Sequence, residues 1–379
     1  MLAAVVALAS GCISSTGADG GTGPVTVTTG LDPAFSILTA GGIDRIYAFF
    51  PNDPTSRVLA AMSANGSIAW NFVVPSCAAG SRCAPVVDAL GNVYITTTQG
   101  LMSRKGSDGG LRWTNNAASF VSIAAGSTGR VYTIDRPFLT QSVYALDGAT
   151  GSVLWKTALP APDGLPVVID EARSNMYVGG RGGPTALDLQ TGAIKWRVTH
   201  SCIGGGETAI ASDGTVYVTC DSDFTSKLYA YDPSGIEKWN ASLGTTEGTF
   251  TPLIDAAGNI YASNSGSVTS LSPSGVVKWR LQDLTQNFVE PALDADGNVF
   301  IIAKLATDAE WDLLAIKDGV VSSNEGPIDP TYAGALLLAP NGQLYYNANG
   351  SLMSLGTSGA DAAAQWVQFG RDYSRGSRR

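Results

Sequence analysis

Few side chains of this 379-residue sequence could do chemistry, and the most reactive are its cysteines and its single histidine. Four cysteines fall within the body of the chain, which allows three disulfide pairings, and proximity favours Cys77–Cys83 and Cys202–Cys220. An even number of cysteines in an exported chain indicates disulfides. A metal site that recruits His200 beside Cys202 is the alternative, but one histidine and two cysteines are a weak ligand set.

Two glutamates form a second candidate site. Glu207 and Glu290 both lie seven residues before a recurring turn glycine, near the start of the expected innermost strand of their repeats. The same position in other repeats holds Ala84, Ser122, Thr251 and Ala335. The two carboxylates would face one channel mouth, where they could take a cation or a basic side chain. The other interpretation is two independent, solvated loop carboxylates.

Other chemical motifs are absent or incomplete. Asp294-Ala-Asp-Gly-Asn298 begins like a calcium loop, but the position that needs a glutamate is Leu305. Sister repeats carry Asp88-Ala-Leu-Gly-Asn92 and Asp255-Ala-Ala-Gly-Asn259, so we expect a hairpin turn. A Ser–His–Asp catalytic triad would have to use His200, and the sequence has no G-x-S-x-G segment to supply its serine. We therefore expect no resident metal and no catalytic residue. Calcium is possible, but no complete motif supports it.

A repeat of about 42 residues must position these groups. Ala145–Trp155 and Ala186–Trp196 both read A-x-D-x-x-T-G-x-x-x-W, and shorter relatives end at Trp70, Trp113, Trp239 and Trp279. Eight polar turns, each followed by an aromatic residue, run between these tryptophans. The seventh tryptophan slot falls on Ser323 and the eighth on Trp366. The period predicts an all-β, eight-bladed β-propeller of four-stranded antiparallel blades.

The repeat motif resembles the tryptophan-docking repeat of the pyrroloquinoline quinone (PQQ)-type propellers. Trp366-Val-Gln-Phe-Gly-Arg-Asp372 likewise resembles the W-x-x-F-x-x-D segment that borders many of them. The resemblance implies that each tryptophan stacks near the repeat glycine of a neighbouring motif. It would give structural docking roles to Trp70, Trp113, Trp155, Trp196, Trp239, Trp279 and Trp366. At the level of fold, the chain is similar to the propeller subunit of the outer-membrane β-barrel assembly machinery.

The N-terminus predicts export. Leu2–Ala9 is an apolar run too short to span a bilayer. The small residues before Cys12 resemble a bacterial lipoprotein signal, which implies lipidation of Cys12; an ordinary signal cut nearby is the alternative. We therefore predict a signal over 1–12, a flexible Ser/Thr/Gly tether over 13–33, a single propeller over 34–376 and a basic tail over 377–379.

Composition narrows the function. Charged residues make up 15% and the net charge is −9, which excludes disorder and a nucleic-acid footprint. Catalytic quinoproteins of the similar superfamily often carry a vicinal cysteine pair, and this chain has no adjacent cysteines. We expect no bound PQQ and no enzymatic activity. The prediction is a monomeric lipoprotein of the outer membrane or cell surface, anchored by lipid, that binds an envelope protein or an extended polymer at the propeller mouth. The alternatives are a PQQ-dependent dehydrogenase and a polysaccharide-binding surface protein.

Overall fold

The strands form where short runs of β-branched and aromatic residues lie between glycine turns. In the sixth repeat, Ile260–Asn264 and Ser267–Leu271 pair as an antiparallel hairpin, and the glycine turn at Gly275 leads to Val277–Leu281. Such turns need residues with positive φ, which glycine adopts without strain. The repeat therefore builds one small sheet per unit.

A computed structural model describes residues 25–29, 39–41, 45–53, 56–75, 85–135, 141–159, 167–180, 182–200, 202, 204–222, 224–245, 248–287, 290–329, 336–339 and 342–358. Within these residues the chain forms eight sheets, each belonging to one blade, and one short 3-10 helix, η1 (Glu171–Arg173). None of the helices in this part of the chain is long and apolar enough to cross a membrane.

The first four blades follow one another along the chain. Blade one contains β2 (Thr39–Gly41), β3 (Arg45–Asp53), β4 (Ser56–Met62) and β5 (Ile68–Val74). Blade two contains β6 (Val86–Val87), β7 (Val93–Thr97), β8 (Gly100–Arg104) and β9 (Leu111–Asn115). Blade three contains β10 (Phe120–Ala125), β11 (Arg130–Asp135), β12 (Ser142–Asp147) and β13 (Val153–Ala158). Blade four contains β14 (Val167–Asp170), β15 (Asn175–Val178), β16 (Thr185–Asp188) and β17 (Ile194–Arg197).

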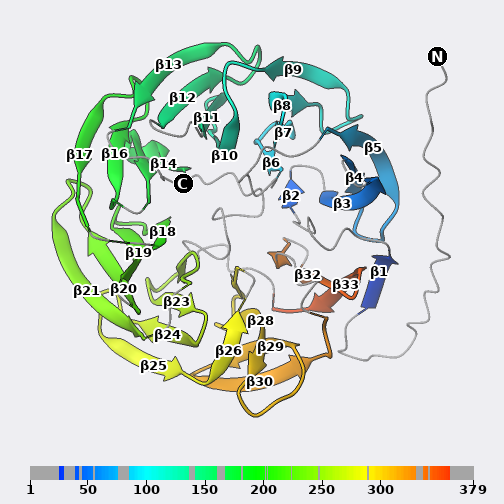
Figure 1. Cartoon of the computed structure of the whole chain (residues 1–379). Helices are drawn as coiled ribbons and strands as arrows, with labels where there is room; N and C mark the ends of the chain where they lie inside the picture. The colour runs from blue at the N-terminus through cyan, green and yellow to red at the C-terminus, as the bar shows by residue number, and fades with distance from the viewer. Residues whose placement is uncertain are drawn as a thin grey trace.

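The other four blades complete the ring (Figure 1). Blade five contains β18 (Gly204–Ile210), β19 (Val216–Ser222), β20 (Thr225–Tyr231) and β21 (Glu237–Gly244). Blade six contains β22 (Leu253–Ile254), β23 (Ile260–Asn264), β24 (Ser267–Leu271) and β25 (Val277–Leu281). Blade seven contains β26 (Leu284–Asn287), β27 (Ala292–Leu293), β28 (Val299–Leu305), β29 (Asp312–Lys317) and β30 (Val320–Glu325). Blade eight contains β31 (Leu337–Leu338), β32 (Gln343–Ala348), β33 (Ser351–Gly356) and β1 (Val25–Thr29).

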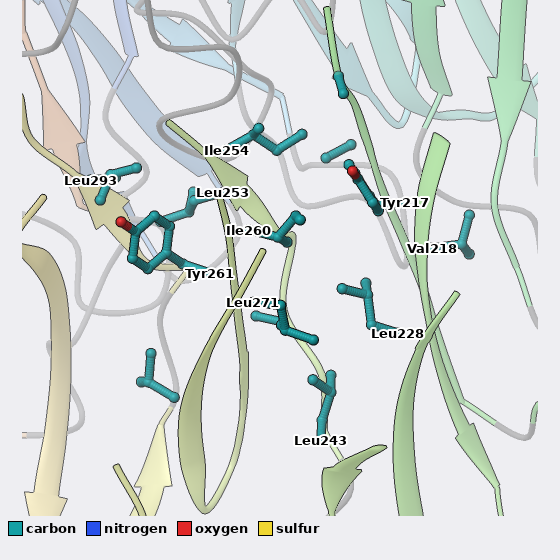
Figure 2. Close-up of a cluster of buried hydrophobic side chains, with 14 of the residues drawn as sticks. Tyr217, Val218, Leu228, Leu243, Leu253, Ile254, Ile260, Tyr261, Leu271 and Leu293 are labelled. Atoms are coloured by element: carbon teal, nitrogen blue, oxygen red, sulfur yellow. The ribbon is translucent and has the colours of Figure 1, made fainter. Parts of the chain in front are cut away.

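The core lies between neighbouring blades. The largest apolar cluster joins side chains of blades four to seven, among them Tyr217, Leu228, Leu253, Tyr261 and Leu293 (Figure 2). A blade has two faces and buries both only against its neighbours. The structure confirms the predicted all-β ring of eight four-stranded blades, with one inner strand of blade seven broken into β26 and β27, which both pair with β28.

The ring closes differently from the prediction. β1 pairs antiparallel with β33 and forms the outermost strand of blade eight, with Val25 opposite Ser354 and Thr29 opposite Ser351. Residues 25–29 therefore belong to the propeller and not to the tether predicted over 13–33. A strand from the N-terminal part of the chain occupies the edge expected for the segment that ends at Trp366. Trp366 itself, Cys12, Cys77, Cys83 and the 377–379 tail lie outside the described residues.

Candidate functional site at the channel mouth

Each of the six docking tryptophans that the structure describes packs on the turn glycine of the next blade. Trp196 of blade four lies against Gly235 of blade five, where a methyl group on the glycine would come within 2.6 Å of the indole ring. Gly235 has φ +88, a conformation that side chains rarely adopt. The described pairs are Trp70–Gly109, Trp113–Gly151, Trp155–Gly192, Trp196–Gly235, Trp239–Gly275 and Trp279–Gly319. This contact fixes the spacing between blades.

The indole N–H groups and the turn aromatics complete each joint. Trp113 Nε1 donates to the carbonyl of Gly148 at 3.0 Å, and Trp196 Nε1 donates to that of Pro233 at 2.8 Å. Within the described residues, the buried Nε1 of Trp155 has no acceptor. Each of these tryptophans also lies beside a tyrosine of its own blade, as Trp196 does beside Tyr177, with ring centroids 5.8 Å apart.

Sequence reasoning missed a recurring basic residue whose lysine members bond to turns of their own blade. Arg112, Lys195, Lys238 and Lys278 each directly precede a docking tryptophan. Lys195 Nζ donates to Asn175 Oδ1 at 2.7 Å and pairs with Asp188 at 3.1 Å, and Lys278 Nζ donates to Asn259 Oδ1 at 3.1 Å. The recurring basic residue before the tryptophan is the signal that could have revealed this role.

The suspected calcium loop is a hairpin turn. Asp294 Oδ1 accepts the N–H groups of Asp296 and Asn298, at 3.1 and 2.8 Å, and its Oδ2 accepts Asn298 Nδ2 at 2.8 Å. The turn itself thus supplies three hydrogen bonds to this carboxylate. Asp88 and Asp255 form the same turn in blades two and six. In the part of the chain that the structure describes, no group of three or more His, Cys, Asp or Glu side chains could hold a metal ion.

Cys202 and Cys220 form a disulfide, with Cα atoms 5.3 Å apart and both residues buried. It joins the segment before β18 to the end of β19, as the spacing predicts. The alternative metal site of His200 and Cys202 is wrong, because the sulfur of Cys202 is bonded to Cys220 and cannot act as a thiolate ligand. His200 instead lies 4.4 Å from the ring of Tyr229, and its Nε2 contacts the hydroxyl of Tyr231. Burial lowers the pKa of His200, which favours the neutral imidazole.

The two candidate glutamates meet at one residue. Glu207 lies in β18 of blade five and Glu290 in the break between β26 and β27 of blade seven. Between them, Thr251 of blade six donates its backbone N–H to Glu290 Oε2 at 2.9 Å and its hydroxyl to Glu207 Oε2 at 3.3 Å. Thr251 is 1% exposed and Glu207 is 8% exposed. The structure therefore brings the two carboxylates together, which rules out independent, solvated loop glutamates.

The segment that leads to Thr251 is held from blade five. The buried carboxylate of Asp221 accepts the backbone N–H groups of Gly248 and Thr249, at 3.1 and 3.3 Å, and the hydroxyl of Ser226 at 2.7 Å. Asp221 directly follows Cys220 of the disulfide. These contacts fix the position of Thr251 and, through it, of both glutamates. We call Glu207, Thr251 and Glu290 the acidic mouth, after the channel-mouth position that the repeat predicts for the two glutamates; their carboxylates supply the negative charge that a cation or a basic side chain would need.

Comparisons with known proteins agree with the eight-bladed propeller fold. The model of the family described as "Outer membrane protein assembly factor BamB" matches residues 23–157, 54–196 and 180–319. The crystal structure of BamB from Moraxella catarrhalis is similar over 88% of this chain and 98% of that one, at 19% identity and a TM-score of 0.64.

Two further solved structures share the fold. The C-terminal WD40 domain of Sif2 is 12% identical over 88% of this chain and 97% of its own, with a TM-score of 0.66. A europium-containing methanol dehydrogenase is 12% identical over 87% of this chain and 85% of its own, with a TM-score of 0.59. No curated protein sequence matches the chain.

Proposed function

Because the chain belongs to the family described as outer membrane protein assembly factor BamB, we propose that it is a non-catalytic scaffold of the cell envelope. In this proposal it is exported, anchored through lipidated Cys12, and binds a partner protein at the acidic mouth. The observation that carries the proposal is the convergence of Glu207 and Glu290 on buried Thr251. Three blades hold the two carboxylates in place, so they are preorganised for a ligand rather than mobile.

The partner segment should be basic. The two carboxylates lie on a chain whose net charge is −9, and opposite charge on the partner speeds encounter and fixes register. Lysine or arginine side chains of the partner would donate to the carboxylate oxygens. The expected complex therefore weakens as salt concentration rises.

The test is capture of partners from detergent-solubilised envelopes with tagged protein. We expect the wild-type chain to retain a defined envelope protein at low salt, and Glu207→Gln/Glu290→Gln to retain it at least tenfold less. Glu310→Gln is the matched control, because Glu310 is exposed and lies in the link between β28 and β29, away from the innermost strands. Equal capture by the double variant and the wild-type chain would refute the role of the acidic mouth. Failure of the wild-type chain to retain any envelope protein would refute the scaffold.

The quinoprotein alternative predicts the opposite charge preference. PQQ is an anionic quinone, and the two carboxylates would repel it unless a cation lay between them. We propose that the protein does not bind PQQ productively. Titration calorimetry with PQQ and calcium tests this directly. Micromolar or tighter binding that Glu207→Gln or Glu290→Gln abolishes would make the propeller a candidate dehydrogenase instead.

A further inference from the structure

A polar hollow lies on blade two, where the blade leads into blade three. It is an open hollow of about 680 Å³, and its polar lining residues are Thr98, Gln99, Thr114, Asn116 and Ser119. Its walls are the turn between β7 and β8 on one side, and the end of β9 with the link to β10 on the other. This volume falls in the range of roughly 300–1,000 Å³ that small-molecule sites occupy.

The backbone under the hollow is fixed. Thr97 Oγ1 donates to the carbonyl of Gly100 at 3.0 Å and accepts the N–H of Gln99 at 3.1 Å, which closes the turn between β7 and β8. On the other wall, Asn115 Nδ2 donates to the carbonyl of Gly151 in blade three at 2.7 Å. A ligand would therefore meet walls that are already ordered, so binding requires little further loss of chain entropy.

The five lining side chains share two properties. All are uncharged hydroxyls or carboxamides, groups that both donate and accept hydrogen bonds. All five residues are exposed, and within the described part of the chain none of these five side chains takes part in a hydrogen bond or ion pair. Their bonding capacity is thus available to a ligand rather than spent on the fold.

These properties select one class of ligand. An ion would find no opposite charge in the lining, and an anion would in addition meet a chain of net charge −9. A peptide gains most of its affinity from aromatic or aliphatic anchors in apolar pockets, whereas the apolar lining here is limited to Gly100 and Ala118. We propose that the hollow binds a neutral, hydroxyl-rich ligand, a carbohydrate chain. This site is separate from the acidic mouth and does not depend on the scaffold function.

Calorimetric titration of the full chain with malto-, cello- and chito-oligosaccharides tests the proposal. We expect saturable binding of at least one of these neutral sugars. Gln99→Ala/Asn116→Ala should weaken it roughly tenfold, because two neutral hydrogen bonds are lost. The melting temperature should not change, since neither side chain bonds to another residue that the structure describes. Gln190→Ala is the matched control, because Gln190 is equally exposed but lies in the turn between β16 and β17.

A blocking variant completes the experiment. Ser119→Trp should fill the hollow and abolish sugar binding in a chain that still melts cooperatively. The proposal is overturned if none of the oligosaccharides binds at millimolar concentration, or if binding survives in both the double and the blocking variants. It is also overturned if a neutral peptide binds where the sugars do not and the double variant loses that peptide. Loss of partner capture with intact sugar binding would refute the scaffold function alone.

Discussion

At the scale of single residues, the joints between blades depend on a glycine under an indole ring. Gly235→Ala would place a methyl group 2.6 Å from Trp196 Cδ2 and would also force alanine into φ +88. We expect a loss of about 3–5 kcal/mol in the free energy of unfolding, which combines backbone strain with overpacking. Urea unfolding followed by tryptophan fluorescence measures it.

Gly129→Ala separates the two contributions. Gly129 has a similar φ of +78, but nothing lies within 4 Å of an added methyl group. Its substitution should cost only the strain, about 1–3 kcal/mol. Equal losses for Gly129→Ala and Gly235→Ala would mean that the indole contact does not hold the blades apart.

Three buried tyrosines predict how stability depends on pH. Burial raises the pKa of Tyr47, Tyr132 and Tyr177 from 10.0 to about 12 in the folded chain. Their contribution to stability is therefore complete below pH 10 and is lost as pH rises towards 12, because the unfolded phenols ionise first. Tyrosinate absorbance and circular dichroism should change together between these values. Ionisation of all thirteen tyrosines before the loss of structure would contradict the burial.

At the scale of elements, the disulfide stabilises blade five. The bond closes a loop with a sequence separation of 18 residues, so Cys202→Ala/Cys220→Ala should cost about 3 kcal/mol. The predicted Cys77–Cys83 bond closes a shorter loop, and its removal should cost less. Denaturant unfolding of each double variant measures both, and mass spectrometry of a non-reduced digest identifies the pairs. Free thiols or crossed pairs would contradict the assignment.

Among the described residues, the six tryptophan–glycine contacts join blades one to seven, and neither joint of blade eight has one. The C–D turn of blades two to seven, between the third and fourth strands, supplies a docking glycine. The fourth strand of blade eight is instead β1, from the far end of the sequence. Ser323 stands at the tryptophan position of blade seven, so blade seven supplies no indole to its joint with blade eight. Trp311 packs instead against the apolar cluster shared by blades seven and eight.

This difference predicts where the ring opens first. We expect hydrogen exchange over residues 294–330 to be faster than over β19, β20 and β21, because the seam after blade seven has no indole dock. Trp279→Ser, which removes the indole between blades six and seven, should cost several kcal/mol in the free energy of unfolding. Uniform protection across all blades would refute this account.

At the scale of the whole molecule, the spacing of the repeats predicted the ring of blades but not the pairing of β1 with β33 that closes it. Turn glycines and tryptophans at a fixed period specify one blade after another, so eight sheets could be read from Trp70, Gly109 and their repeats. The pairing of β1 with β33 joins residues over 320 positions apart, and Val25–Thr29 carries no repeat motif. Likewise, the repeat aligned Glu207 with Glu290, but only the three-dimensional structure shows that both bond to Thr251.

The last prediction tests this closure. Removal of residues 1–30 takes away β1 and leaves the edge of β33 without its partner strand. An unpaired edge destabilises the ring and invites pairing between molecules. Compared with a chain that lacks only residues 1–24, we expect a lower melting temperature and concentration-dependent dimers or aggregates in size-exclusion chromatography. Both truncations remove the same expected signal and Cys12, so the comparison isolates β1. If the two truncated chains melt at the same temperature and both remain monomeric, β1 does not close the propeller.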